Sequence, residues 1–91
     1  MVSAIVFIRA DVGRIPEVAQ QIADIDGVSE VYSVTGKLDL IALVRVRDID
    51  GVAAAVADKV NKVPGVLDTE THIAFRAYST VDLEAAFSIG T

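Results

Sequence analysis

The sequence predicts an α+β domain of the βαββαβ type, a ferredoxin-like sandwich in which an antiparallel four-stranded sheet carries two helices on one face. One observation behind this is an internal repeat. A shift of 38 positions places Ile8, Val18 and Ile22 on valines, and it places Gly13 and Gly27 on glycines. The other observation is that strand-like and helix-like apolar patterns alternate within each half. A β-α-β unit that occurs twice is typical of this fold.

The first half predicts a strand, a helix and a second strand. Residues 2–10 are rich in β-branched residues and apolar at both alternating sets of positions, so we expect both faces of this strand to be buried. Pro16 suits the first turn of a helix. The buried stripe of that helix consists of Ile15, Val18, Ile22 and Ile25. Gly27 ends the helix, and residues 28–35 alternate with more polar positions, as an edge strand does.

The second half follows the same order. Residues 39–47 form the second strand that is apolar on both faces, and Asp48 or Asp50 is expected to cap the next helix. The buried stripe of this helix consists of Val52, Val56, Val60 and Val63. Residues 66–77 then form the last strand. Right-handed crossovers place the first and third strands in the centre of the sheet, which agrees with their apolar character on both faces.

The end of the chain predicts a short C-terminal helix over residues 79–88. Ser79-Thr80-Val81-Asp82 resembles a capping box, and Leu83 and Phe87 lie four residues apart. We therefore expect one domain, residues 1–91, with a helical extension that docks on a neighbouring subunit.

The composition excludes several classes of function. Eight basic residues against 13 acidic ones give a net charge of −5, which supplies no cationic field for the phosphates of nucleic acid. No apolar run is long enough to span a membrane, and the N-terminus lacks the basic start of a signal peptide. Cysteine is absent, so the chain has no disulfide and no cysteine–zinc site. A cytoplasmic location fits these absences.

The apolar content predicts self-association. The chain is 53% hydrophobic, which is more than one small core needs. With both helices on one face of the sheet, one apolar set of the first strand must point away from them. The two sets are Ile5 with Phe7, and Ala4 with Val6 and Ile8. At roughly 25 cal/mol per Å² of apolar surface, leaving either set in water is costly, so we expect an obligate sheet-to-sheet dimer with higher assembly.

No catalytic or metal-binding constellation is present in the sequence. His72 is the only histidine, and we interpret it as a surface or interface residue of an edge strand. The pairs Asp24/Asp26 and Asp48/Asp50 are more simply helix-end residues than acid–base partners. No phosphate-binding loop motif occurs. We therefore expect no enzyme, no metal and no cofactor.

The turn Gly36-Lys37-Leu38-Asp39 is the candidate binding site, although a plain hairpin turn would have a similar sequence. A free amino acid offers an ammonium group and a carboxylate, which need an acceptor carboxylate and converging backbone N–H donors. Asp39 supplies the first, and the open glycine turn supplies the second. The hydroxyls of Thr35 and Thr71 would contribute if the last strand begins nearby.

Two segments of the chain carry recognisable motifs. Residues 31–40, VYSVTGKLDL, contain a V-x-x-x-x-G-x-x-D turn, and residues 63–71, VPGVLDTET, are similar to a P-G-V-x-x-T-x-T strand start. With these motifs the chain resembles the regulation-of-amino-acid-metabolism (RAM) domain, the effector-binding half of Lrp/AsnC-type transcription regulators. The match covers residues 2–77 and does not include the helix-turn-helix domain of those regulators, so the chain looks like the stand-alone form.

The resemblance implies a sandwich that dimerises through its sheets, with dimers assembling into an octamer-like ring of about four dimers. Amino-acid effectors would lie between dimers, against the turn. The site residues that this implies are Gly36 and Asp39 first, then Thr35, Lys37 and Leu38, with Thr69 and Thr71 as weaker candidates and Tyr32 as a pocket wall. Contact with DNA would come through a partner, such as a full-length Lrp/AsnC-type regulator in a mixed ring.

Three functions are compatible with the sequence. The leading one is a non-enzymatic amino-acid-sensing and oligomerisation module that acts in transcriptional or metabolic regulation through partner proteins. The second is an enzyme of the dimeric α+β-barrel kind that acts on a small molecule. Such sites usually need a histidine, asparagine or tryptophan in a cleft, whereas this chain has no tryptophan and one histidine on a predicted edge strand. The third is a purely structural oligomerisation domain.

Overall fold

The computed structural model describes residues 1–78 and 80, and it shows the predicted βαββαβ order. The sheet has the strand order β2-β3-β1-β4, and every neighbouring pair is antiparallel. The predicted central and edge strands are therefore confirmed. The helices and strands are β1 (Val2–Ala10), α1 (Ile15–Ala23), β2 (Val28–Ser33), β3 (Leu40–Val46), α2 (Ile49–Val56) and β4 (Val66–Ala74), with 3-10 turns at Val12–Arg14 and Val60–Lys62.

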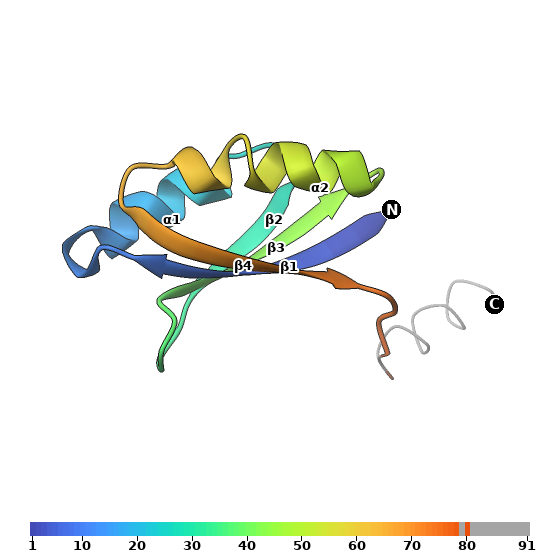
Figure 1. Cartoon of the computed structure of the whole chain (residues 1–91). Coiled ribbons are helices and arrows are strands. Elements are labelled where there is room, and N and C mark those ends of the chain that lie inside the picture. The colour runs from blue at the N-terminus through green and yellow to red at the C-terminus, as the bar shows by residue number, and fades with distance from the viewer. Residues whose placement is uncertain (79, 81–91) are drawn as a thin grey trace.

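Both helices lie on the same face of the sheet, and the core fills the space between the two layers (Figure 1). β1 and β3 pair from Val2↔Val46 to Ile8↔Leu40, so alternate residues of both strands point toward the helices together. The sheet residues buried there are Ala4, Val6, Ile8, Ala10, Leu40, Ala42 and Val44. The sequence left open which apolar set of β1 faces the helices. The structure buries Ala4, Val6 and Ile8 against them, so Ile5 and Phe7 point away from the helices.

The two helices begin as the sequence predicts, but both end early. α1 ends at Ala23, before Ile25 of its predicted stripe. Asp48 caps α2, since its side chain accepts a hydrogen bond of 2.8 Å from the Gly51 N–H. The helix was expected to continue to Val63, yet it ends at Val56. The backbone of Lys59 leaves the helical conformation, with φ −125° and ψ −60°. Val60 reaches the core from the following 3-10 turn instead and is fully buried.

The strand ends also differ slightly from the expected ones. β2 ends at Ser33 rather than residue 35, because the Val34 N–H already turns back to the Asp39 carbonyl at 3.1 Å. β4 ends at Ala74 rather than residue 77. The predicted C-terminal helix over residues 79–88 lies outside the described residues. Within residues 1–78 and 80, no helix is long and apolar enough to cross a membrane.

Candidate functional site

The turn between β2 and β3, residues 34–39, projects from the sheet on the side away from the helices (Figure 1). Gly36 has φ +106°, in the left-handed region that favours glycine. No heavy atom beyond its chain neighbours lies within 4 Å of the position that a Cβ would take. Backbone conformation, rather than lack of space, therefore explains a glycine at this position.

Asp39 is the anchored residue of this turn. Its backbone N–H donates to the Ile8 carbonyl at 3.0 Å, and its carbonyl accepts from the Val34 N–H at 3.1 Å. One carboxylate oxygen, Oδ2, accepts a hydrogen bond of 2.8 Å from the Ala10 N–H. The sequence did not predict this last bond. It fixes the orientation of the carboxylate, and the other oxygen has no hydrogen-bond partner among the described residues.

The backbone N–H groups of the turn are available to a ligand. Those of Thr35, Gly36, Lys37 and Leu38 donate to no other group in the described part of the chain. The side chain of Lys37 is exposed beside them. The turn thus presents unpaired N–H donors and an ammonium group within a few residues of a fixed carboxylate. These are the complements of the carboxylate and the ammonium group of a free amino acid.

The structure does not bring every predicted site residue to this turn. Thr69 and Thr71 lie on β4, which is separated from β3 by β1, and they pair with Ile8 and Val6 on the helix side of the sheet. The hydroxyl of Thr69 donates to Oδ1 of Asn61 at 2.6 Å. Within one chain, β1 therefore lies between these two threonines and the turn.

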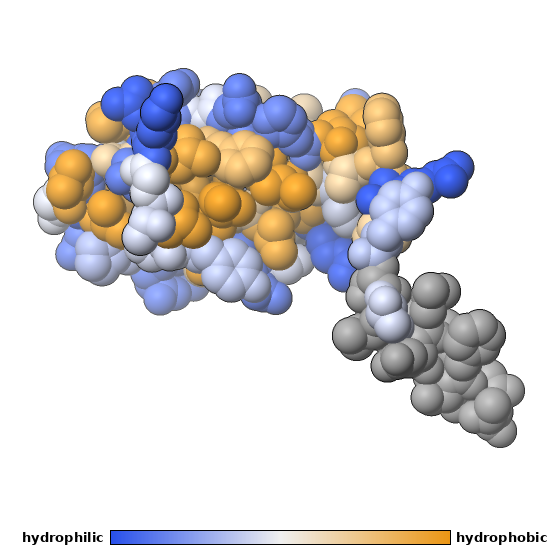
Figure 2. Space-filling view, turned by 90° about the horizontal axis from the view of Figure 1, so that it is seen from below, coloured by the Kyte–Doolittle hydropathy of each residue, from blue (hydrophilic) through white to orange (hydrophobic). Residues whose placement is uncertain are grey.

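The sheet face away from the helices, here called the open face, is apolar along its centre. Figure 2 views the molecule from this side and shows a band of apolar side chains across it. The register places four half-buried residues in this centre: Ile5, Phe7, Ile41 and Leu43. Polar residues of the edge strands flank them, namely Glu30, Tyr32, Glu70 and His72. In the described residues nothing covers this centre.

Two polar pairs border the open face. On β4, the His72 ring packs edge-on against the Phe7 ring, with centroids 5.2 Å apart, and its Nε2 lies 3.0 Å from Oε2 of Glu70. On β2, the hydroxyl of Tyr32 donates to the Glu30 carboxylate. This hydrogen bond, together with the negative charge of Glu30, raises the pKa of Tyr32 above its usual value. Because Tyr32 is on the edge strand β2 and pairs with Ile41, it lies at the margin of the open face.

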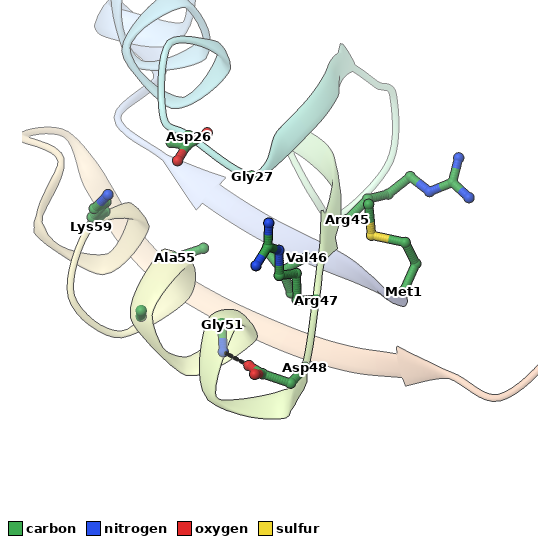
Figure 3. A pocket seen from close by; sticks show the side chains of 11 residues that line it. Met1, Asp26, Gly27, Arg45, Val46, Arg47, Asp48, Gly51, Ala55 and Lys59 are labelled. Carbon is green, nitrogen blue, oxygen red and sulfur yellow. Dashed lines mark hydrogen bonds between the residues drawn. The ribbon is translucent and has the colours of Figure 1, made fainter.

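A pocket of about 440 Å³ lies at the other end of β3, away from the turn (Figure 3). The α1–β2 connection, the end of β3 and α2 surround it. Its charged lining consists of Asp26, Arg45, Arg47, Asp48 and Lys59. The sequence interpretation missed this pocket, since it treated residues 39–47 only as a strand and Asp48 or Asp50 only as a helix cap. The cluster of charges there was visible, but its proximity to Asp26 and Lys59 arises only from folding.

Comparison with known proteins identifies the family. A family model described as "Lrp/AsnC ligand binding domain" matches residues 3–82. TTHA0845 from Thermus thermophilus, a solved structure, is 43% identical with a TM-score of 0.82, and the match covers 87% of this chain and 99% of that one.

Two further relatives delimit what the similarity covers. The uncharacterized HTH-type transcriptional regulator PH1916 of Pyrococcus horikoshii is 42% identical over 59 residues, which are 65% of this chain and 39% of that protein. The chain thus spans well under half the length of this curated relative. The feast or famine regulatory protein of M. tuberculosis, solved in complex with L-methionine, shares the fold at 24% identity and a TM-score of 0.72, over 88% of this chain and 54% of that one. The chain belongs to the Lrp/AsnC ligand-binding domain family.

Proposed function

We propose that this chain is an amino-acid-binding and oligomerisation domain that acts in regulation through partner proteins. The family is regulatory and non-enzymatic, and its ligand-binding domains oligomerise and take amino-acid effectors. The observation that carries the proposal is the turn. Its four consecutive N–H groups have no partner in the described residues, and they adjoin the anchored carboxylate of Asp39.

In the proposed complex, the turn N–H groups and Lys37 bind the α-carboxylate of the ligand, and the free oxygen of Asp39 accepts from its α-ammonium group. The anchoring bond to Ala10 supports this role, because a pre-oriented carboxylate loses less conformational entropy when it binds. Thr35 and Leu38 adjoin the ligand from the same turn. A second subunit contributes Thr69 and Thr71 to this ligand site. Tyr32 forms part of the margin of the ligand site.

The open face is the proposed dimer interface. Its central residues Ile5, Phe7, Ile41 and Leu43 form a continuous apolar strip on two adjacent strands. Packing two such faces together would remove this strip from water, which favours association by roughly 25 cal/mol per Å² buried. The flanking pairs Tyr32–Glu30 and His72–Glu70 would lie at the polar rim, as is usual for subunit interfaces. Dimers would then assemble further so that turns of neighbouring dimers enclose the ligand.

A thermal-shift screen of the twenty amino acids tests the binding proposal, with L-methionine included because the M. tuberculosis protein was solved with it. A ligand that binds only the folded state raises the melting temperature in a concentration-dependent manner. We expect one or a few amino acids to do so and the effect to be lost in Asp39→Asn. Asp50→Asn is the matched control, because it removes the same charge from an exposed residue outside the turn.

The competing structural role gives a different result in the same experiment. If the domain served only to oligomerise, no amino acid would change its melting temperature or its mass by light scattering. A full screen without a single stabilising amino acid would therefore refute the sensing role and leave the oligomerisation role intact.

A further inference from the structure

The pocket at the end of β3 is a separate place from the turn. β3 starts next to the turn and ends at Val46 in the pocket lining. A seven-residue strand rises about 3.3 Å per residue, so the two places are roughly 20 Å apart within one chain. A ligand at one cannot also contact the other. The volume of about 440 Å³ lies within the range that small-molecule sites occupy.

Three charged side chains at this pocket have no partner of their own. Arg47, Lys59 and Asp26 form no ion pair and no side-chain hydrogen bond with any described residue. Figure 3 shows them around the pocket, with Asp26 on the α1–β2 connection, Lys59 beyond α2 and Arg47 after β3. Arg45 and Met1 point away at the margin.

The remaining lining is explained by packing and leaves the space open. A Cβ on Gly27 would lie 2.9 Å from Cγ1 of Val46. A Cβ on Gly51 would lie 2.9 Å from the Cβ of Val46. Both glycines are therefore needed for close packing around Val46. Asp48 is engaged as the cap of α2, through its bond to Gly51. The helix contributes Ala54 and Ala55 to the wall, and these small side chains do not fill the pocket.

We propose that this pocket is a second ligand site, for a small oxyanion that also carries a hydrogen-bond donor. Arg47 and Lys59 hold the oxyanion, a carboxylate or a phosphate, because charge-assisted hydrogen bonds from a guanidinium and an ammonium group suit either one. Asp26 accepts from the hydroxyl or amine at the other end of the ligand. The positive charge that attracts the oxyanion comes from Arg47 and Lys59. This inference does not depend on the proposed function of the turn.

An NMR titration of the full chain labelled with ¹⁵N tests this site with four probes: acetate, glycolate, inorganic phosphate and glycerol 3-phosphate. Glycolate differs from acetate by one hydroxyl, so this pair tests the hydrogen bond to Asp26. Comparison of the two phosphates with the two carboxylates shows which oxyanion the site prefers. We expect saturable shifts at the amides of Gly27, Arg47 and Gly51, with glycolate bound more tightly than acetate. Arg47→Ala should weaken binding about tenfold or more, since it removes charged hydrogen bonds.

Two variants make the test specific. Asp26→Ala should tighten acetate binding several-fold, because it removes a repulsive charge, and it should also abolish the preference for glycolate, because no acceptor for the hydroxyl remains. Arg14→Ala is the control, since it removes an exposed cation outside the pocket lining and should change no affinity more than about twofold. The proposal is overturned if no probe gives saturable shifts, if Arg14→Ala weakens binding as much as Arg47→Ala does, or if Asp39→Asn removes the shifts, which would assign them to the turn.

Discussion

The carboxylate of Asp39 accepts a hydrogen bond of 2.8 Å from the backbone N–H of Ala10, which lies 29 residues earlier in the chain. Pairing between β1 and β3 stops at Ile8↔Leu40, so the N–H of Ala10 has no partner on β3. The side chain of Asp39 replaces that missing partner. The residue that we propose as the ligand anchor therefore also fixes the end of a central strand, and it uses a different oxygen for each role.

This double role predicts different effects for two substitutions at Asp39. Asp39→Ala leaves the part-buried Ala10 N–H without an acceptor, which should lower the free energy of unfolding by about 1–3 kcal/mol. Asp39→Asn retains an acceptor oxygen and should cost less than about 1 kcal/mol, while it still abolishes amino-acid binding. Urea unfolding followed by circular dichroism measures both. Equal losses in the two variants would show that the hydrogen bond to Ala10 contributes little.

Two glycines with positive φ should respond differently to alanine. Gly36 has open space around it, so Gly36→Ala carries only the conformational penalty, about 1 kcal/mol in the free energy of unfolding. At Gly65, with φ +98°, the new Cβ would also lie 2.7 Å from Cγ2 of the fully buried Val18. Gly65→Ala should therefore cost about 2–4 kcal/mol, since a core clash adds to the penalty. Thermal denaturation compares the two, and a larger loss at Gly36 would contradict this account.

A charge in the centre of the open face should separate the subunits without unfolding them. Leu43 is half-buried in one chain, so Leu43→Lys retains most of the fold but places an ammonium group in the proposed interface. We expect the mass by light scattering to fall to that of the monomer, with the far-ultraviolet circular dichroism unchanged. Val12→Lys is the control, because Val12 is 81% exposed and does not lie on the open face. An unchanged mass in Leu43→Lys would refute this interface.

The Tyr32–Glu30 pair predicts a titration effect. Glu30 raises the pKa of Tyr32, so the neutral phenol is favoured in the folded protein. Its contribution to stability is present at pH values below the usual tyrosine pKa of about 10, and it is lost as the pH rises through the raised value. Glu30→Gln should bring the pKa of Tyr32 back down.

Ultraviolet absorbance follows the ionisation of the phenol directly. Tyr78→Phe, used as the background, leaves Tyr32 as the only tyrosine, so the signal is assigned without ambiguity. If Tyr32 titrated with the same pKa before and after Glu30→Gln, the negative charge of Glu30 would be excluded as a cause of the raised value.

Local pattern was enough to predict the elements, their order and the two central strands. β1 spans residues 2–10 as predicted, and Asp48 caps α2 as one of the two aspartates expected to do so. Such features depend on residues close in sequence, whose alternation or helical spacing follows from local backbone geometry. The early end of α2 was missed, because Val60 suits a helical stripe as well as it suits the 3-10 turn that the chain forms.

The position of Gly36 and Asp39 in a turn between an edge strand and a central one could be predicted from local pattern, since a glycine between two strand patterns has few other roles. The surroundings of these two residues, in contrast, depend on the packing of distant segments. The register directs Ile5 and Phe7 away from the helices, brings Ala10 to Asp39, and places Thr69 on the far side of β1. The packing of α2 and the α1–β2 connection against the sheet brings Asp26 and Lys59 to one pocket with Arg47. These relationships join residues distant in the chain, so the packing of strands and helices fixes them, and no local pattern does.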